Sequence, residues 1–195
     1  MIDEQSARQE HAQLVKLLAE RAYRQGSFTL SSGATSDFYL DVKQATYSPY
    51  GARLVGRAML DLMRRFNVEA VGGLTMGADA VVSATVLTSA IEESPIPGFV
   101  VRKQPKMHGL SKWIEGIEPG NLRVAIVDDV VTTGNSILKA ADRVRELGAE
   151  VVLVSCVVDR EQGGKRRLEL DVPEFVPLCT ISEIKRAASN LMQSV

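Results

Sequence analysis

The chain has 195 residues, a length that fits a single domain with a substantial buried core. Its 23 basic and 24 acidic residues nearly balance, so no global charge favours nucleic acid or membrane as a partner. Two cysteines far apart in apolar surroundings argue against a disulfide framework. The lack of a targeting segment or long apolar span leads us to expect a cytoplasmic protein.

Helices and strands are expected to alternate along the chain. In chain order we expect a helix over 11–23, a strand over 38–42, a helix from Ser48-Pro49, a strand over 68–74, a helix over 78–91, strands over 98–102 and 123–127, a helix over 135–147 and a strand over 151–158. Such alternation predicts an α/β fold with a central parallel sheet flanked by helices. Ligands bind sheets of this kind at the carboxyl ends of the strands.

The most informative run follows the strand over 123–127. Asp128 and Asp129 end an apolar stretch, and after two valines the residues over 132–136 combine hydroxyls with a glycine at the start of a helix. Backbone N–H groups, hydroxyls and the positive end of the helix can all face one anion there. Because the two carboxylates would repel a phosphate, they need hydroxyl or cationic partners, and a sugar phosphate meets both demands. The alternative is a chance strand end that binds nothing.

A second turn rich in glycine follows the strand over 68–74. It runs over residues 72–79 and opens a helix, so it is another candidate anion site. A tight strand–helix turn without a ligand is the alternative reading.

A third strand end carries a local excess of positive charge. No acidic residue occurs from Ser94 to Ile114, and the basic side chains in this stretch are Arg102, Lys103, Lys106, His108 and Lys112. Glycines punctuate the same stretch, so residues of about 103–120 are expected to form a mobile lid over a polyanion. A solvated basic loop is the alternative.

These segments together resemble a known family. The run over 124–137 looks like the signature of type I phosphoribosyltransferases, which bind 5-phosphoribosyl 1-pyrophosphate (PRPP). The order of the basic residues over 102–109, followed by Ile114-Glu115-Gly116, resembles the catalytic loop of the orotate phosphoribosyltransferases. Residues 28–33 and 36–41 resemble the segment of that family that helps hold the pyrimidine, and Val157–Arg160 resembles the point where it supplies an arginine to orotate.

The resemblance implies a fold, a reaction and partners. The fold is that of the type I phosphoribosyltransferases, one domain over 1–195 with a hood formed largely by residues of about 1–45. The reaction transfers phosphoribosyl from PRPP to orotate, giving orotidine 5′-phosphate and pyrophosphate in UMP biosynthesis. The cofactor is Mg²⁺, held mainly by PRPP and water with no direct protein ligand. The partners are PRPP and orotate, and the protein is expected to be a homodimer with a shared active site.

The same resemblance assigns roles to individual residues. The catalytic candidates are Lys106, Lys103, His108, Asp128 and Asp129. The PRPP-binding candidates are Arg102, Lys103, Lys106, His108, Asp128, Asp129, Val130, Val131, Thr132, Thr133, Gly134, Asn135 and Ser136. The orotate-binding candidates are Thr132, Arg160, Tyr39, Ser32 and Gly33. Phe38 is the alternative to Tyr39 for stacking on the pyrimidine, and a core aromatic of the strand is the other reading of either residue.

Two departures from the family pattern leave questions open. Many relatives carry a lysine where Ser31 stands, and many carry a lysine or a glycine-rich variant where this chain reads Thr75-Met76-Gly77. Whether other cations compensate is open at this point. The alternative functions are a phosphoribosyltransferase for another pyrimidine or purine base, and a regulator that senses PRPP without catalysis.

Overall fold

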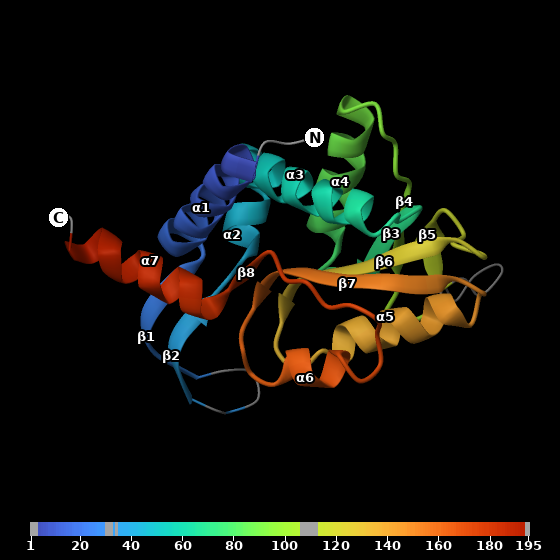
Figure 1. The fold of residues 1–195 in the computed structure, drawn as a ribbon. Coiled ribbons are helices and arrows are strands. Elements are labelled where there is room, and N and C mark those ends of the chain that lie inside the picture. The colour runs from blue at the N-terminus through green and yellow to red at the C-terminus, as the bar shows by residue number, and fades with distance from the viewer. Residues whose placement is uncertain (1–3, 30–32, 34, 106–112, 194–195) are drawn as a thin grey trace.

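A twisted sheet of six strands forms the centre of the molecule (Figure 1). The computed structural model describes residues 4–29, 33, 35–105 and 113–193. The elements in chain order are α1 (Glu4–Arg21), β1 (Tyr23–Thr29), β2 (Thr35–Leu40), α2 (Lys43–Thr46), α3 (Pro49–Arg65), β3 (Ala70–Leu74), α4 (Asp79–Ile91), β4 (Gly98–Val101), β5 (Ile114–Gly116), β6 (Arg123–Val131), α5 (Asn135–Arg145), β7 (Glu150–Asp159), α6 (Gly164–Leu168), β8 (Cys179–Thr180) and α7 (Ile181–Gln193).

The sheet is mostly parallel, as the alternation of elements predicted. Its strand order is β5-β4-β3-β6-β7-β8, and all neighbours pair in parallel except β5, which runs antiparallel to β4. The strand β5 differs from the expected loop over 103–120. Ile114 is buried and pairs with Val101, because the sheet edge offers both an apolar contact and free backbone groups.

Helices cover both faces of the sheet. In Figure 1, α1, α3 and α4 lie above it and α5 and α6 lie below it. The side chains of β6 alternate between the two layers: Ala125 and Val127 join the core under α3 and α4, whereas Val124 and Ile126 join the core over α5. A strand that is buried on both faces must be apolar throughout, which explains the uninterrupted apolar run before Asp128.

A second, smaller sheet consists of β1 and β2. Together with the helices α1 and α7 it forms a unit that we call the hood. The strands β1 and β2 pair antiparallel, and the ring of Tyr23 stacks on that of Phe38 with centroids 5.9 Å apart. The helix α7 packs on α1 and β1, so the C-terminal end of the described chain completes a unit that was expected to come mainly from the N-terminal segment. The Nε2 atom of His11 lies 3.0 Å from a carboxylate oxygen of Glu183 across this contact.

The start of α3 agrees with the sequence prediction. The Ser48 hydroxyl accepts a hydrogen bond of 3.1 Å from the Gly51 N–H, and Pro49 occupies the first turn, where its missing N–H costs no hydrogen bond.

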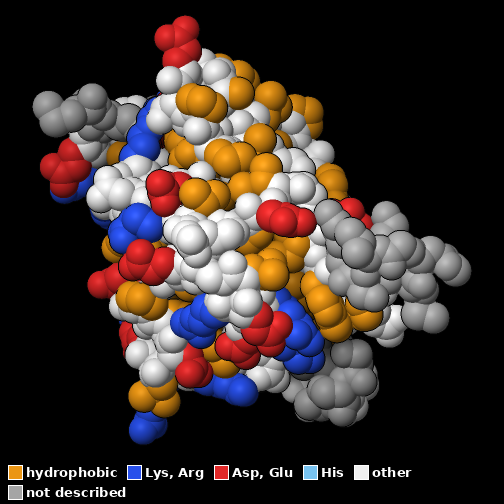
Figure 2. Space-filling view, turned by 90° about the vertical axis from the view of Figure 1, so that its right-hand side faces the viewer, with side chains coloured by type: hydrophobic (Ala, Val, Ile, Leu, Met, Phe, Trp, Pro, Cys, Tyr) orange, Lys and Arg blue, Asp and Glu red, His pale blue; other side chains and the backbone are white. Residues whose placement is uncertain are grey.

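The helix α4 leaves apolar surface exposed. Figure 2 shows the face that lies on the right of Figure 1, and hydrophobic side chains gather over its upper part. Leu87 and Ile91 of α4 are exposed by 63% and 72%.

Within the described ranges, each helix is too short or too polar to cross a membrane.

Candidate active site

The candidate site lies at the carboxyl ends of the parallel strands β4, β3, β6 and β7. The strands β3 and β6 are neighbours in the sheet, and the helices that follow them, α4 and α5, lie on opposite faces. The chain therefore diverges at this point and leaves a crevice between the two connections, which is where open α/β sheets bind ligands.

The turn after β6 encloses a hollow of about 90 Å³. We call residues 132–136 the phosphate turn. The hollow is lined by Asp128, Val130, Val131, Thr132, Thr133, Gly134, Asn135, Ser136 and Ile137. Gly134 caps α5 in a left-handed conformation with φ of 78°, which other residues adopt only with strain. The structure thus brings the predicted phosphate-binding residues around one cavity at a helix N-terminus.

Two buried carboxylates border this turn. Asp128 and Asp129, the acidic pair, are 6% and 8% exposed and lie near the end of β6. The Asp129 N–H donates a hydrogen bond of 2.9 Å to Oδ1 of Asp128. Burial, together with the negative charge of Asp129, raises the pKa of Asp128 to about 7. The acidic pair therefore gains or loses a proton near neutral pH.

Lys43, at the start of α2, forms an ion pair with Oδ2 of Asp129. Burial disfavours the charged ammonium, but the hydrogen bond and charge of Asp129 outweigh it and raise the pKa of Lys43. The sequence analysis missed this residue because no motif links positions that are 86 residues apart. Its only signal in the sequence was its position two residues after Asp41, which ends the segment that resembles the pyrimidine-holding part of the family.

The glycine turn after β3 packs directly against the acidic pair. A Cβ atom on Gly77 would lie 2.1 Å from Oδ1 of Asp128 and 3.0 Å from Oδ1 of Asp129, so no other residue fits without moving a carboxylate. Beside it, the Thr75 hydroxyl donates a hydrogen bond of 3.0 Å to Asp79 at the start of α4. The first and second predicted anion turns are therefore neighbours in space.

Arg160, directly after β7, presents an unpaired donor group at the hood. Its guanidinium carbon lies 4.7 Å from the centroid of the Phe38 ring. Its Nε and Nη2 atoms are buried and find no hydrogen-bond partner in the described part of the chain. Burial lowers the pKa of this arginine. Buried guanidinium donors left unpaired are costly, so this arrangement suits a planar acceptor such as a carboxylate.

The hood places its two neighbouring aromatic residues differently. Phe38 is buried beneath Arg160, and Nζ of Lys185 from α7 also lies 4.5 Å from its ring centroid. Tyr39 points to the opposite face of β2, where it is 47% exposed and packs on Phe28. The structure therefore brings Phe38 next to Arg160, whereas Tyr39 lies on the other face of β2. Gly33 has a φ of 82°, and Ser32 lies outside the described residues.

The predicted lid cations are only partly described. Nη1 of Arg102 lies 3.1 Å from Glu115 of β5, and Lys103 is exposed at the end of β4. Lys106 and His108 lie outside the described residues.

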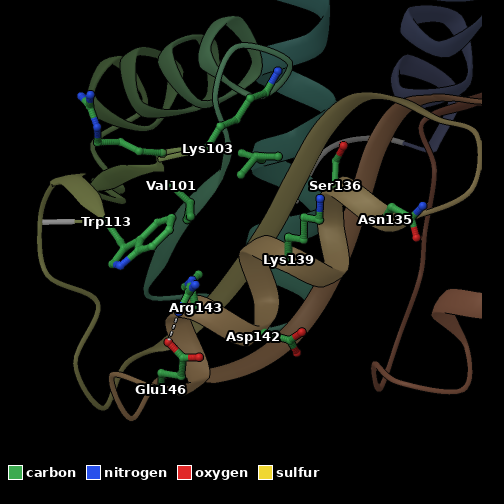
Figure 3. Close-up of a pocket in the computed structure, with 11 residues that line it drawn as sticks. Val101, Lys103, Trp113, Asn135, Ser136, Lys139, Asp142, Arg143 and Glu146 are labelled. Atoms are coloured by element: carbon green, nitrogen blue, oxygen red, sulfur yellow. Dashed lines mark hydrogen bonds and ion pairs between the residues drawn. The ribbon is translucent and has the colours of Figure 1, made fainter. Parts of the chain in front are cut away.

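A larger hollow of about 530 Å³ lies between the end of β4 and the helix α5 (Figure 3). On its far side Arg143 stacks 4.0 Å over the Trp113 ring and pairs with Glu146. In Figure 3 the Lys103 side chain extends away from that pair. The larger hollow combines an apolar wall of Leu74, Val101 and Trp113 with charged side chains, and it shares only Asn135 and Ser136 with the phosphate turn. The smaller hollow is surrounded by the whole phosphate turn, so its surroundings suit a phosphate better.

The sequence of this chain is similar to those of known proteins. Residues 70–178 match the family model described as a phosphoribosyl transferase domain. The orotate phosphoribosyltransferase of Aquifex aeolicus is 44% identical over 177 residues, which cover 91% of this chain and 97% of that protein.

Solved structures of orotate phosphoribosyltransferases have a fold similar to that of this chain. The orotate phosphoribosyltransferase of Mycobacterium tuberculosis H37Rv in complex with Fe(III) dicitrate superposes with a TM-score of 0.78 at 37% identity, covering 90% of this chain and 98% of that one. The same enzyme in complex with PRPP gives a TM-score of 0.74 at 34% identity, covering 90% and 99%.

The contact of Gly77 with the acidic pair gives a testable prediction. The Gly77→Ala variant should lower kcat/KM for PRPP by roughly 10- to 100-fold, because displacing a positioned group by about 1 Å is costly. The control is Arg166→Ala, at an exposed position on α6. Steady-state kinetics of both variants, with thermal melting to verify folding, make the comparison. Equal activities would contradict the packing role of Gly77.

Proposed function

This chain belongs to the orotate phosphoribosyltransferase family, and on that premise we propose that it transfers the 5-phosphoribosyl group of PRPP to orotate. The products are orotidine 5′-phosphate and pyrophosphate. One observation carries the proposal: a phosphate-sized hollow at a helix N-terminus is bordered by a buried pair of carboxylates. A ribose phosphate offers an anion to the first and hydroxyl groups to the second.

The proposed chemistry follows from the charges that develop during transfer. Breaking the bond at the anomeric carbon leaves positive charge on the ribose and negative charge on the pyrophosphate. Asp128 and Asp129 accept hydrogen bonds from the ribose hydroxyls and stabilise the cationic ring, in a buried setting where charges interact strongly. Arg102, Lys103, Lys106 and His108 are our candidates for stabilising the leaving pyrophosphate.

Arg160 is our candidate for orotate selection. Its unpaired Nε and Nη2 atoms match the planar carboxylate and carbonyl oxygens of orotate, and the Phe38 ring supports the guanidinium from the hood side. Thr132 directly follows Val131, whose carbonyl accepts a hydrogen bond from the main-chain N–H of Arg160, and is our candidate for a hydroxyl contact beside the ribose. The alternatives, another base or a regulator without catalysis, are disfavoured by similarity to orotate enzymes along nearly the whole chain.

We further propose that the reaction depends on Mg²⁺ carried by PRPP. Magnesium prefers oxygen ligands and keeps several waters, so pyrophosphate and ribose oxygens suit it. The residues present fit this arrangement, since Lys43 already engages Asp129 and Asp128 hydrogen-bonds to the main chain. When bound, the metal neutralises charge on the leaving group.

The activity is tested by incubating the protein with PRPP, Mg²⁺ and one base at a time. We expect orotate to be consumed with release of pyrophosphate, and uracil and adenine to be poor substrates. Chelation of the metal should abolish turnover, and added Mg²⁺ should restore it. Preference for a base other than orotate, or PRPP binding without turnover, would point to the alternative functions.

The assignment of Arg160 has its own test. The Arg160→Ala variant should raise KM for orotate by roughly 10- to 100-fold, because a hydrogen bond to a charged group contributes about 1.5–3 kcal/mol. Arg160→Lys should be intermediate, since it keeps the charge but loses the planar fork. PRPP affinity should stay unchanged in both, and Arg166→Ala on exposed α6 is the control. Weakened PRPP binding with an unchanged KM for orotate would rule the assignment out.

We also propose that the protein is a homodimer whose interface includes α4. Ala80, Ser83, Ala84, Leu87 and Ile91 recur at helical spacing and form an exposed face of small and apolar side chains. The hydrophobic side chains on this side of the molecule are visible in Figure 2. An adjoining hollow of about 310 Å³ is lined by Tyr47 and Asp79 among others. Contiguous apolar surface of this kind is typical of protein interfaces.

Replacing Leu87 by glutamate should disrupt this dimer, because the interface would have to bury an unpaired charge. Sedimentation or light scattering should find a dimer for the wild type and a monomer for Leu87→Glu. Leu170→Glu is the matched control, since Leu170 is the same residue type and is 82% exposed in the turn that follows α6. The proposal fails if the wild type sediments as a monomer or if both variants remain dimeric.

A further inference from the structure

The ion pair between Lys43 and Asp129 joins two separate parts of the fold. Lys43 follows the hood strand β2, whereas Asp129 lies near the end of the central strand β6. The lysine side chain is 39% exposed and the aspartate side chain 12%, so the contact lies at the rim of the crevice, half-shielded from water.

The two carboxylates of the acidic pair have different surroundings. Asp129 is bonded to Lys43, while Asp128 accepts a hydrogen bond from the main chain and lies against Gly77. Across the sheet, Asp128 pairs with Cys156 of β7, whose thiol pKa burial raises well above its usual range, so that the thiol is uncharged. The other charged groups that act on this cluster are Asp41, beside Lys43, and Asp159, beside Cys156.

Within the described residues, Lys43 is the basic side chain bonded to the acidic pair. The glycine turn after β3, where many relatives have a lysine, supplies no cation here because it reads Thr75-Met76-Gly77. Two adjacent carboxylates in a buried site repel each other, and a nearby cation offsets that repulsion. The helix that follows the hood strand β2 therefore supplies the acidic pair with its positive charge in the described part of the chain.

We infer that Lys43 is a positioning residue: its ion pair holds the Asp129 carboxylate oriented beside the phosphate turn, so that the acidic pair can receive the ribose hydroxyls of PRPP. This role rests on the proposed function and specifies how its ribose site is maintained. Lysine suits the task because its flexible stem lets the ammonium shift when a ligand enters.

The role has a consequence for pH dependence. Asp128 must lose its proton to accept hydrogen bonds from hydroxyl groups as a carboxylate, and burial holds its pKa at about 7. Activity with PRPP should therefore fall as pH drops below neutral. The positive charge of Lys43 lowers the pKa of Asp128, so removing that charge raises this pKa and moves the acidic limb of the profile to higher pH.

The experiment compares Lys43→Met, Lys43→Arg and Lys16→Met. Lys16 lies on α1 beside Glu20 and serves as the control for loss of a lysine far from the acidic pair. We expect Lys43→Met to shift the acidic limb of kcat/KM for PRPP upward by about one pH unit, equivalent to about tenfold in rate below that limb. Lys43→Arg should restore most of the profile, Lys16→Met should leave it unchanged, and KM for orotate should change little in any variant.

Three outcomes would overturn the inference. They are an unshifted limb in Lys43→Met, a loss of activity that is uniform across pH, and the same shift in Lys16→Met. Failure of the proposed function is a separate result: the wild type would then turn over no orotate. In that case the pH dependence of PRPP binding, measured by calorimetry on the same variants, tests the inference. Thermal melting distinguishes either result from misfolding.

Discussion

The site depends on two like charges buried side by side at the end of β6. Asp128 and Asp129 are almost inaccessible to water, so their repulsion is not screened as it would be on a surface. The surroundings meet this constraint in three ways. The main chain hydrogen-bonds to Asp128, the proton affinity of Asp128 rises, and Lys43 neutralises Asp129. Gly77 is the steric counterpart, since only a residue without a side chain leaves room for both carboxylates.

The topology of the sheet explains why these groups meet. Parallel strands place all their carboxyl ends at one edge, and adjacent β3 and β6 send their helices to opposite faces. The glycine turn after β3 therefore faces the acidic pair without a helix between them. The next strand, β7, ends directly before Arg160. The main-chain N–H of Arg160 donates a hydrogen bond of 2.9 Å to the Val131 carbonyl and so fixes this residue beside the phosphate turn.

Two contacts connect the hood and the segment after it to the core at this site. They differ in which of the two parts supplies the positively charged side chain. The core supplies Arg160 to the Phe38 ring of the hood, and the segment after the hood strand β2 supplies Lys43 to Asp129 of the core. Under the proposed function, recognition is divided between these parts. Backbone groups of a strand–helix turn suit the phosphate, whereas side chains at the contact with the hood suit the base. Such a division lets one fold serve several bases while its phosphate turn stays the same.

The sequence by itself determined the alternating α/β architecture, the cap of α3 at Ser48, the phosphate turn with its acidic pair, and the candidacy of Arg160. These signals are local, because periodicity, caps and turn residues act over a few neighbouring positions. Only the tertiary structure decided that Lys43 pairs with Asp129, that Gly77 backs the carboxylates, and that Phe38 lies under Arg160. It also decided that Ile114–Gly116 closes the sheet edge and that α7 joins the hood. Each of these contacts joins residues of different elements, many of them far apart in the chain. No local pattern encodes such a contact, because it forms only when the packing of the core brings the two elements together.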